Sequence, residues 1–363
     1  MTDNSKLIGI LDNFEIDDRV LSVTPLGSGL INDTYLVRTS GRNYALQRIN
    51  NAIFKDVELL QHNIEAVTGH IRERLVARGE ADIDRKVLNF IRTRGASSKT
   101  YVRCGDGTYW RVSVFIEGSH TYDIVNPEYS SVAGHAFGEF ESMLVDLDEP
   151  LGESIPDFHN MPLRLVQIRE AASADPVGRA SGVSRLLDLV EENAEHMCLA
   201  EDLHAQGILP KRICHCDSKV GNILFDDNGK VLCVIDLDTV MPSFVFSDFG
   251  DFMRTAGNPV PEDSPEFDKV ELRMDIFEAF AKGYVKATKD FLLPVEKENL
   301  PYAVQLFAFM QSVRFLCDYI NGDTYYKTAY PEHNLVRAEN QMKLFLSAKA
   351  KEDRMRMIID SVR

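Results

Sequence analysis

The chain of 363 residues carries a formal net charge of −16, from 40 basic and 56 acidic side chains. This surplus of negative charge opposes binding to nucleic acid and to anionic membranes, because both present phosphate groups. Hydrophobic residues make up 44% and charged residues 26%, which are ordinary values for a folded, soluble protein. The length exceeds that of one compact core, so we expect two domains or lobes.

The sequence shows neither a signal peptide nor a membrane-spanning segment. The first thirteen residues lack the basic start and apolar run of a signal peptide, and no stretch approaches the ~18 apolar residues that cross a bilayer. The six cysteines show no spacing typical of a disulfide framework. We therefore expect a cytoplasmic protein with reduced cysteines and no membrane partner.

The first third of the chain predicts a β-rich lobe with one helix inserted. Apolar and polar residues alternate in short segments separated by glycines, which is typical of strands. From Phe54 to Ala77 apolar residues instead recur at helical spacing. The expected strands are Val20–Leu26, Asp33–Arg38, Asn43–Ile49, Lys99–Val102 and Tyr109–Ile116.

After Gly118 the pattern becomes helical, with one strand-rich island at Ile213–Leu237. These features predict an α+β fold with a small N-terminal lobe, residues 1–117, and a larger helical C-terminal lobe, residues 118–363. The expected long helices are Tyr129–Leu147, Val183–Gln206, Val270–Thr288 and Leu300–Ile320.

The island carries the pattern H-x-D-x-K-x-x-N, and Asp236 follows a short hydrophobic strand within it. Phosphoryl transfer requires a carboxylate at the acceptor hydroxyl and oxygen ligands for magnesium on the phosphates. Asp217 is placed to handle the hydroxyl, and Asn222 and Asp236 to hold Mg²⁺, in the spacing of a kinase catalytic loop. Lys219 would neutralise charge on the transferring group.

Neighbouring residues in this region favour structural roles. We expect His215 to orient the loop through backbone hydrogen bonds. Cys214 and Cys216 lie one residue apart and point to opposite faces, so they would pack and not chelate a metal together. Asp248, in a later Asp-Phe-Gly sequence, comes too late to be the second magnesium ligand. We expect its carboxylate to accept backbone N–H bonds and to fix the catalytic loop.

The β-rich lobe offers candidates for nucleotide binding. A flap at Gly27, Ser28 and Gly29, followed by Asn32, would bring backbone amides to the phosphates. The next strand should supply the side chain that reaches the α- and β-phosphates. Alternation places Gln47 and Arg48 on opposite faces, and both remain candidates.

Two further features belong to the same nucleotide site. The helix that follows the third strand offers Glu58 or Glu65 as an acidic partner for the phosphate-binding residue. Phe115 and Glu117 lie in the expected hinge, where adenine would bond to backbone groups.

At these motifs the chain resembles the aminoglycoside phosphotransferase and choline kinase superfamily, and more closely the N-acetylhexosamine 1-kinases. The resemblance implies a protein-kinase-like two-lobe fold, ATP as co-substrate, Mg²⁺, and transfer to the anomeric hydroxyl of an N-acetylhexosamine such as GlcNAc or GalNAc. The stretches that carry it are Gly27–Tyr35, Asp236–Pro242, Arg314–Leu316 and Tyr330–Arg337.

The resemblance also implies roles for individual residues. It makes Asp217 the catalytic base and Asn222 and Asp236 the metal ligands, and it favours Glu65 as the acidic partner. The implied substrate contacts come from Leu30, Asp217, Asp236, Arg314 and Tyr325.

Two positions depart from the family pattern. Leu30 stands where a histidine that contacts the sugar is expected, and Thr255 stands where an aromatic wall is expected. Both departures leave the epimer preference and the N-acetyl requirement open.

The sequence leaves other functions to be weighed. The same chemistry would serve another sugar, a choline-like amino alcohol or an aminoglycoside. A regulatory pseudokinase would be expected to lack Asp217, Asn222 or Asp236, and all three are present. A sulfatase or other hydrolase of amino-sugar polymers is excluded, since no Gly-x-Ser-x-Gly or sulfatase nucleophile motif occurs. For the assembly we expect a monomer or a weak homodimer.

Overall fold

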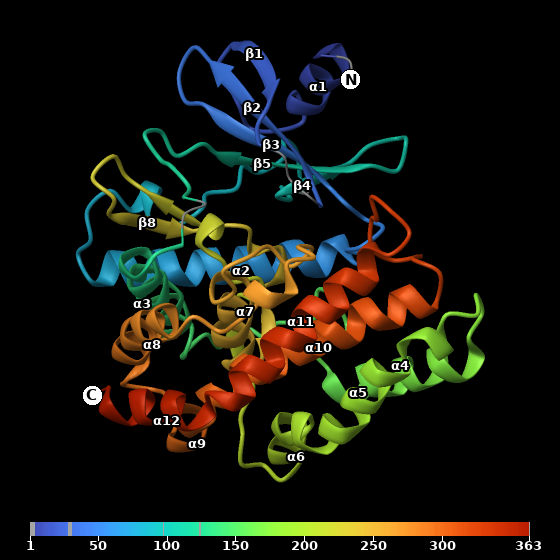
Figure 1. The fold of residues 1–363 in the computed structure, drawn as a ribbon. Helices are drawn as coiled ribbons and strands as arrows, with labels where there is room; N and C mark the ends of the chain where they lie inside the picture. Colours follow the sequence, from blue (N-terminus) through green and yellow to red (C-terminus); the bar gives the residue numbers. More distant parts are fainter. Residues whose placement is uncertain (1–3, 28–30, 97, 123–124, 363) are drawn as a thin grey trace. The chain divides into compact units, whose positions relative to one another are not determined.

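The computed structural model describes residues 4–27, 31–96, 98–122 and 125–362, and it confirms the α+β class (Figure 1). The chain forms two compact units, each built from separate parts of the sequence. The sheet unit comprises residues 1–121, 146–156 and 223–241, and the helical unit comprises residues 122–145, 157–222 and 242–363. The lobe boundary expected between residues 117 and 118 stays a prediction.

The sheet unit contains a five-stranded antiparallel sheet in the order β1-β2-β3-β5-β4. Directly opposed residues share a face of a sheet, so its register decides which side chains meet. Gln47 on β3 lies opposite Thr34 on β2 and Arg111 on β5. The strands are β1 Val20–Pro25, β2 Asp33–Thr39, β3 Tyr44–Ile49, β4 Tyr101–Arg103 and β5 Tyr109–Val114.

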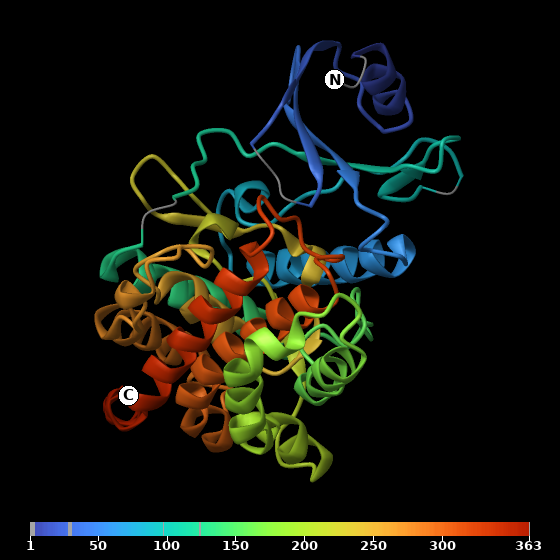
Figure 2. The ribbon, with the colours of Figure 1, turned by 45° about the vertical axis from the view of Figure 1, so that its right-hand side comes forward.

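One face of this sheet is covered by a short N-terminal helix that the sequence did not predict. The helix α1, Asn4–Leu11, lies beside the sheet in Figure 2 and buries Leu7 and Leu11. These side chains join one apolar cluster with Leu46 and Trp110 of the sheet. Burial of this face fixes which side chains of β3 and β5 point the other way.

The sheet unit also holds a long helix and a hairpin. The predicted helix is confirmed as α2, Val57–Ala77, and the Asp56 carboxylate caps it by accepting the Leu59 N–H at 2.9 Å. The hairpin pairs β7, Ile223–Phe225, with β8, Val231–Val234, just before Asp236. Short 3₁₀ turns complete the unit at Ile83–Arg85 and Leu237–Thr239.

The helical unit consists mainly of α-helices. Two of them, α10 and α11, run side by side in Figure 1. The helix expected over residues 183–206 is divided at Cys198 into α5 and α6. Helices α4, α7, α9, α11 and α12 were not predicted. The helices are α3 Pro127–Met143, α4 Met161–Ala174, α5 Ser184–Met197, α6 Leu199–Ala205, α7 Phe246–Ala256, α8 Met274–Thr288, α9 Pro294–Glu298, α10 Leu300–Ile320, α11 His333–Ala350 and α12 Glu352–Ser361.

The remaining regular elements are short strands and 3₁₀ turns. Strand β6, Arg212–Cys214, enters the catalytic loop, and β9 spans Met241–Ser243. The remaining 3₁₀ turns are Ala180–Val183, Val220–Asn222 and Phe267–Lys269. Among the helices that the structure describes, none is both long and apolar enough to span a membrane.

Helices α3 and α8 pack with their backbones in close contact, and glycines make this possible. A Cβ on Gly134 would lie 2.2 Å from the carbonyl oxygen of Phe280, and one on Gly283 would lie 2.0 Å from that of Ser131. Both distances are far below a van der Waals contact, so neither position has room for a side chain. The close approach fixes α8 against α3, the helix whose Phe137 and Phe140 rings meet the His215 ring of the predicted catalytic loop.

Candidate functional site

The predicted catalytic loop lies in the helical unit, directly after β6. Lys219 Nζ is 3.0 Å from Oδ2 of Asp217, and Nδ2 of Asn222 lies 3.1 Å from the same oxygen. Asn222 Nδ2 also donates to the backbone carbonyl of Asp217 at 2.8 Å. Two donors therefore fix the Asp217 carboxylate. The amide nitrogen of Asn222 is used inside the loop, which leaves its Oδ1 as the atom that would ligate a cation.

Asp248, on α7, is hydrogen-bonded to the backbone of this loop. Its Oδ2 accepts the His215 N–H at 2.8 Å, and its Oδ1 accepts the Cys216 N–H at 2.7 Å. The Ser218 hydroxyl donates to the backbone carbonyl of Asp248 at 2.5 Å. Cys216 has a φ of 63°, a left-handed conformation that non-glycine residues seldom adopt. The buried carboxylate therefore stabilises a strained turn just before Asp217.

His215 is completely buried beneath the loop. Its Nδ1 accepts the Asp217 N–H at 3.3 Å, and its ring meets the edges of Phe137 and Phe140 on α3. Packed in this way, the imidazole orients the loop backbone through the Asp217 N–H.

Cys214 and Cys216 are both buried, and burial raises the pKa of each thiol well above its usual value. The Cys214 thiol donates to the carbonyl oxygen of Phe244 at 3.3 Å. A thiol that donates a hydrogen bond is protonated, whereas a metal ligand must be a thiolate. The geometry therefore supports packing roles for both cysteines.

Asp236 belongs to the sheet unit and follows β8 in a left-handed conformation, with a φ of 62°. The next carboxylate, Asp238, is buried and makes two strong contacts. Asn32 Nδ2 donates to it at 2.6 Å, and Arg111 Nη1 lies 2.5 Å from it. The Ser154 hydroxyl donates to the backbone carbonyl of Asp238 at 2.8 Å. These contacts anchor the segment that carries Asp236.

The two phosphate-contact candidates on β3 differ in their surroundings. Arg48 is exposed, and its Nη1 lies 3.5 Å from Asp33. Gln47 is partly buried, donates to the Thr34 hydroxyl at 3.1 Å and accepts a bond from Arg111 Nε at 3.0 Å. Gln47 thus lies beside a buried cation that sequence reasoning missed. The available signal was an arginine between the apolar residues Trp110 and Val112 of β5.

The remaining nucleotide-side candidates have local partners in the sheet unit. Glu65 accepts a bond from the Thr100 hydroxyl at 2.6 Å and one from Arg92 at 3.3 Å. The Phe115 N–H donates to the backbone of Asn43 at 2.9 Å, and the Glu117 carboxylate accepts the Asn43 side chain at 2.5 Å. Both contacts tie the expected hinge to the start of β3.

The expected phosphate flap is described only in part. Gly27 has a φ of 70°, which suits a tight turn. Ser28, Gly29 and Leu30 lie outside the described residues.

The expected sugar contacts lie on and after α10 in the helical unit. The Arg314 guanidinium stands 5.3 Å from the ring of Phe158 and 5.8 Å from that of Tyr326, and it donates to Gln311 at 3.1 Å. Tyr325 is 65% exposed. The Asp318 carboxylate shapes the loop that carries both tyrosines, because it accepts the backbone N–H groups of Thr324, Tyr325 and Tyr326 at 2.9, 2.8 and 3.0 Å.

Two charged residues of α7 near the loop were missed from the sequence. Asp251 is buried, and its pKa is raised by burial and by the negative charge of Asp217, against the opposing effect of Arg254. Arg254 lies between Asp251, at 2.9 Å, and Glu262, at 2.6 Å. Thr255, where an aromatic wall was expected, donates its hydroxyl to the backbone of its own helix.

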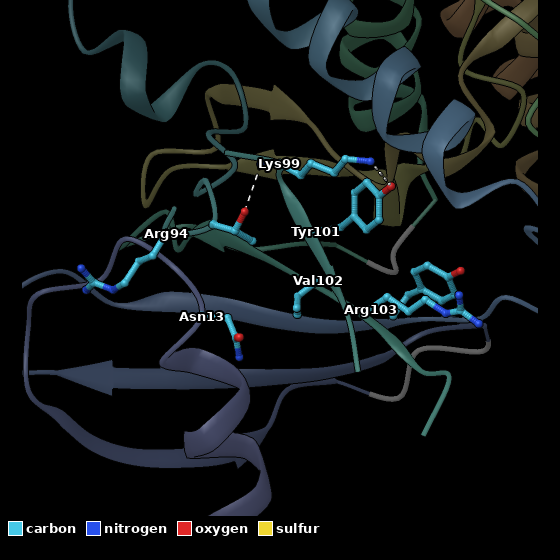
Figure 3. A pocket seen from close by; sticks show the side chains of 8 residues that line it. Asn13, Arg94, Lys99, Tyr101, Val102 and Arg103 are labelled. Atoms are coloured by element: carbon cyan, nitrogen blue, oxygen red, sulfur yellow. Dashed lines mark hydrogen bonds between the residues drawn. The ribbon is translucent and has the colours of Figure 1, made fainter. Parts of the chain in front are cut away.

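A cavity of about 510 Å³ in the sheet unit contains none of the predicted site residues. Arg94 and Arg103 point toward opposite ends of it (Figure 3). Arg94 is paired with Asp17 at 2.9 Å, and Lys99 with Glu58 at 2.8 Å. The Arg103 guanidinium stands 5.7 Å from the centre of the Tyr109 ring. Because these cations do not converge on one point, the cavity does not resemble a phosphate site. The cavity is lined by Asn13, Thr93, Arg94, Lys99, Tyr101, Val102, Arg103 and Tyr109.

The catalytic loop and the Asp236 segment both fall inside a match to a family model. That model describes the phosphotransferase enzyme family, APH, and it matches residues 22–288 of the chain. The chain belongs to this family. Membership in the phosphotransferase enzyme family agrees with the hydrogen-bonded Asp217 in its loop.

Solved structures show the fold that this member of the family adopts. The aminoglycoside phosphotransferase from Alicyclobacillus acidocaldarius is similar with a TM-score of 0.64 at 15% identity, covering 97% of this chain and 96% of its own. Spectinomycin phosphotransferase, in complex with ADP and spectinomycin, has a TM-score of 0.56 at 13% identity, with 97% and 99% covered. Choline kinase from Cryptosporidium parvum has a TM-score of 0.59 at 13% identity, with 99% of each chain covered. The fold is therefore that of the aminoglycoside phosphotransferase and choline kinase group.

Proposed function

We propose that the chain is an ATP-dependent kinase that transfers the γ-phosphoryl group to the anomeric hydroxyl of an N-acetylhexosamine, giving the sugar 1-phosphate. Family membership supports the phosphotransfer. The observation that carries the proposal is the Asp217 carboxylate, fixed by Lys219 and Asn222 in a loop whose backbone is bonded to Asp248. Such a carboxylate is preorganised to orient a hydroxyl for in-line attack.

Asp217 would orient the sugar O1 and take its proton late in the reaction. The Lys219 ammonium, 3.0 Å from Asp217, would stabilise negative charge that develops on the transferring group. Because Lys219 and Asn222 both donate to the same oxygen, the other carboxylate oxygen is the one proposed to face the acceptor.

The donor set fits magnesium. Asn222 Oδ1 and the Asp236 carboxylate are hard oxygen donors of the kind that Mg²⁺ prefers, and the buried Cys214 and Cys216 thiols are excluded as soft ligands. When bound, the ion would neutralise charge on the β- and γ-phosphates. The anchoring of Asp238 by Asn32 and Arg111 would hold Asp236 at the end of β8 for this purpose.

The sheet unit supplies the proposed nucleotide site. The flap that contains Gly27 would cover the phosphates, Gln47 would contact them, and the backbone from Phe115 to Glu117 would bond to adenine. The similar spectinomycin phosphotransferase is described in complex with ADP, which supports ATP as co-substrate. We assign Gln47 in preference to Arg48, because Arg48 is exposed beside Asp33.

The helical unit supplies the proposed acceptor site, with Arg314 and Tyr325 contacting the sugar. Two rings flank the Arg314 guanidinium. Among the residues that the structure describes, its one hydrogen bond runs to Gln311, so most of its N–H groups are available to hydroxyl or acetyl oxygens. The same geometry disfavours a choline-like acceptor. A quaternary ammonium needs open aromatic faces, and here a cation already stands over Phe158 and Tyr326.

The test is phosphate transfer from ATP with Mg²⁺ across a panel of acceptors. The panel holds N-acetylglucosamine, N-acetylgalactosamine, the parent hexoses, choline and an aminoglycoside, and the product is analysed for an acid-labile sugar 1-phosphate. We expect transfer to an N-acetylhexosamine. Transfer to choline or the aminoglycoside alone would replace the acceptor, and nucleotide binding without transfer to any of them would favour the pseudokinase.

A further inference from the structure

Two buried carboxyl groups meet behind the catalytic loop in the helical unit. Glu141, on α3, is 2% exposed, and Asp248, on α7, is fully buried. One ligand atom from each, together with the Cys214 sulfur, lie within 4.8 Å of one another. Two negative charges at this separation in an apolar interior would be strongly unfavourable, so the site must contain a cation or a proton.

Asp248 makes the contacts expected of a carboxylate. Its two oxygens accept the backbone N–H groups of His215 and Cys216, at 2.8 and 2.7 Å. Hydrogen bonds from backbone donors to both oxygens stabilise the charged form of a carboxylate. A proton on either oxygen would displace one of these donors.

Glu141 has a different environment. Its Oε2 accepts the Tyr284 hydroxyl at 2.5 Å, whereas its buried Oε1 has no donor among the residues that the structure describes. The guanidinium that could neutralise it is already engaged, because Arg212 pairs with Glu296 through two bonds of 2.9 and 3.0 Å. A proton on Oε1 would remove the buried charge and turn this oxygen into a donor.

We propose that Glu141 is a positioning residue: its carboxylic acid donates a hydrogen bond to Asp248, which in turn holds the backbone of the catalytic loop. The inference rests on the proposed phosphotransfer only for its kinetic consequence. A continuous chain of hydrogen bonds then runs from the Tyr284 hydroxyl through Glu141 and Asp248 to the backbone that precedes Asp217.

The groups around Glu141 act in both directions. The Tyr284 hydrogen bond and the Arg212 charge favour the ionised form, but burial, the largest effect, favours the protonated form. Burial and the Asp248 charge raise the pKa of Glu141 well above its usual value, and Glu296 acts in the same direction. The Tyr284 pKa is also raised, by burial and by Glu141, so its hydroxyl keeps the proton that it donates.

A metal ion in place of the proton is disfavoured by the same contacts. Both Asp248 oxygens already accept backbone N–H groups, and the Cys214 thiol donates to the Phe244 carbonyl oxygen at 3.3 Å. A divalent ion would need these groups turned toward it and the thiol deprotonated.

The first test is spectroscopic and uses the intact protein. The infrared C=O stretch of a buried carboxylic acid, absent from carboxylates, should be present at pH 7 in the wild type and lost in Glu141→Gln. Asp318→Asn is the matched control: this carboxyl group is also buried, but it accepts the N–H groups of Thr324, Tyr325 and Tyr326 and does not face Glu141, so its variant should retain the band. Loss of the band in Asp318→Asn alone, its absence from the wild type, or one tightly bound metal per chain would overturn the proposal.

The second test follows the pH dependence of unfolding. With a raised pKa in the folded state, the Glu141 proton stabilises the fold fully below the unfolded value of 4.5, and this contribution is lost as pH rises. We therefore compare the unfolding equilibrium constants of the wild type and of Glu141→Gln between about pH 5.5 and 7.5. The ratio of the wild-type constant to the variant constant should increase about tenfold for each pH unit. Equal slopes would contradict a shared proton.

The third test is kinetic. Glu141→Gln can still donate from its amide to Asp248, so we expect its kcat to stay within about threefold of the wild type. Glu141→Met cannot donate, and we expect its kcat to fall about 100-fold with the nucleotide KM unchanged, as for a misplaced catalytic group. Equal losses in both variants would overturn the positioning role. Failure of the proposed sugar kinase activity would leave the infrared and unfolding results unaffected.

Discussion

Arg111 on β5 and Asp238 after β8 form an ion pair of 2.5 Å within the sheet unit, with side chains only 3% and 4% exposed. The guanidinium also donates to Gln47 at 3.0 Å, and the carboxylate accepts Asn32 at 2.6 Å. The pair therefore joins the sheet to the segment that carries Asp236. Most charges are solvated at protein surfaces, so a completely buried pair must be compensated by these neighbours.

Removing one member of this pair should destabilise the protein strongly. Arg111→Ala leaves the Asp238 carboxylate buried without its cation, and we expect the free energy of unfolding to fall by about 3–5 kcal/mol. Urea unfolding followed by circular dichroism measures this change. The double variant Arg111→Met with Asp238→Leu should recover much of the loss, because no unpaired charge remains.

The exposed pair of Arg169 and Glu191 provides a control, since both side chains are about half exposed. Arg169→Ala should shift the urea midpoint far less than Arg111→Ala. Similar shifts for the two variants would show that burial does not set the importance of the Arg111 pair.

Asp217→Asn should remove the group that orients and deprotonates the acceptor while keeping the shape of the loop. We expect kcat to fall by about 10²–10⁴-fold, with the affinity for ATP nearly unchanged. ADP release measures the first and calorimetric titration the second. Asp188→Asn, on the exposed face of α5, is the matched control and should retain full activity. Near-normal turnover in Asp217→Asn would remove this residue from its proposed role.

Asp248→Ala should separate the loop from its support. Two buried N–H groups, those of His215 and Cys216, would lose their acceptor, at a cost of about 1–3 kcal/mol each. We expect both the melting temperature and kcat of Asp248→Ala to be lower than those of the wild type. Asp248→Asn keeps one acceptor oxygen and should fall between the wild type and Asp248→Ala, and a ranking in any other order would contradict the contacts described.

The contact between α3 and α8 should not tolerate side chains at its glycines. Gly283→Ala places a Cβ 2.0 Å from the Ser131 carbonyl oxygen, so the helices must separate. We expect a loss of about 1–3 kcal/mol in the free energy of unfolding. Gly182→Ala, where no atom lies within 4 Å of the added Cβ, is the control and should be nearly neutral. Thermal unfolding of the two variants distinguishes the cases.

Because of the buried His159, we expect the free energy of unfolding of the protein to decrease in mild acid. Burial, together with the charges of Arg314, Arg164 and Arg254, lowers its pKa well below 6.5. The unfolded chain therefore binds a proton below pH 6.5 that the folded chain does not, so the contribution of neutral His159 is complete above pH 6.5 and is lost as pH falls.

Relative to His159→Gln, the wild type should lose up to about 1.4 kcal/mol of stability per pH unit between pH 6.5 and 5. Urea unfolding at several pH values measures the two slopes. Parallel slopes would mean that His159 already carries its proton in the folded state.

Some elements were predictable because their information is local. Strands β1, β2, β3 and β5 alternate apolar and polar residues, and α2 repeats its apolar residues at helical spacing, so short windows of sequence were enough. The helix α7 was missed although Phe246, Phe249 and Met253 recur at helical spacing. Its polar residues Asp248 and Asp251 are buried as well, and the partners of Asp248 come from a distant loop that a local pattern does not reveal.

The sequence by itself determined the spacing of Asp217, Lys219 and Asn222, because a single loop carries all three and their order is written in consecutive residues. Only the tertiary structure decided which groups support this loop and the separate segment that carries Asp236. Arg111 meets Asp238, and Tyr284 meets Glu141, through contacts between segments far apart in the chain. Whether a buried carboxyl group is ionised depends on the donors and charges that folding places around it, and no local pattern encodes that arrangement.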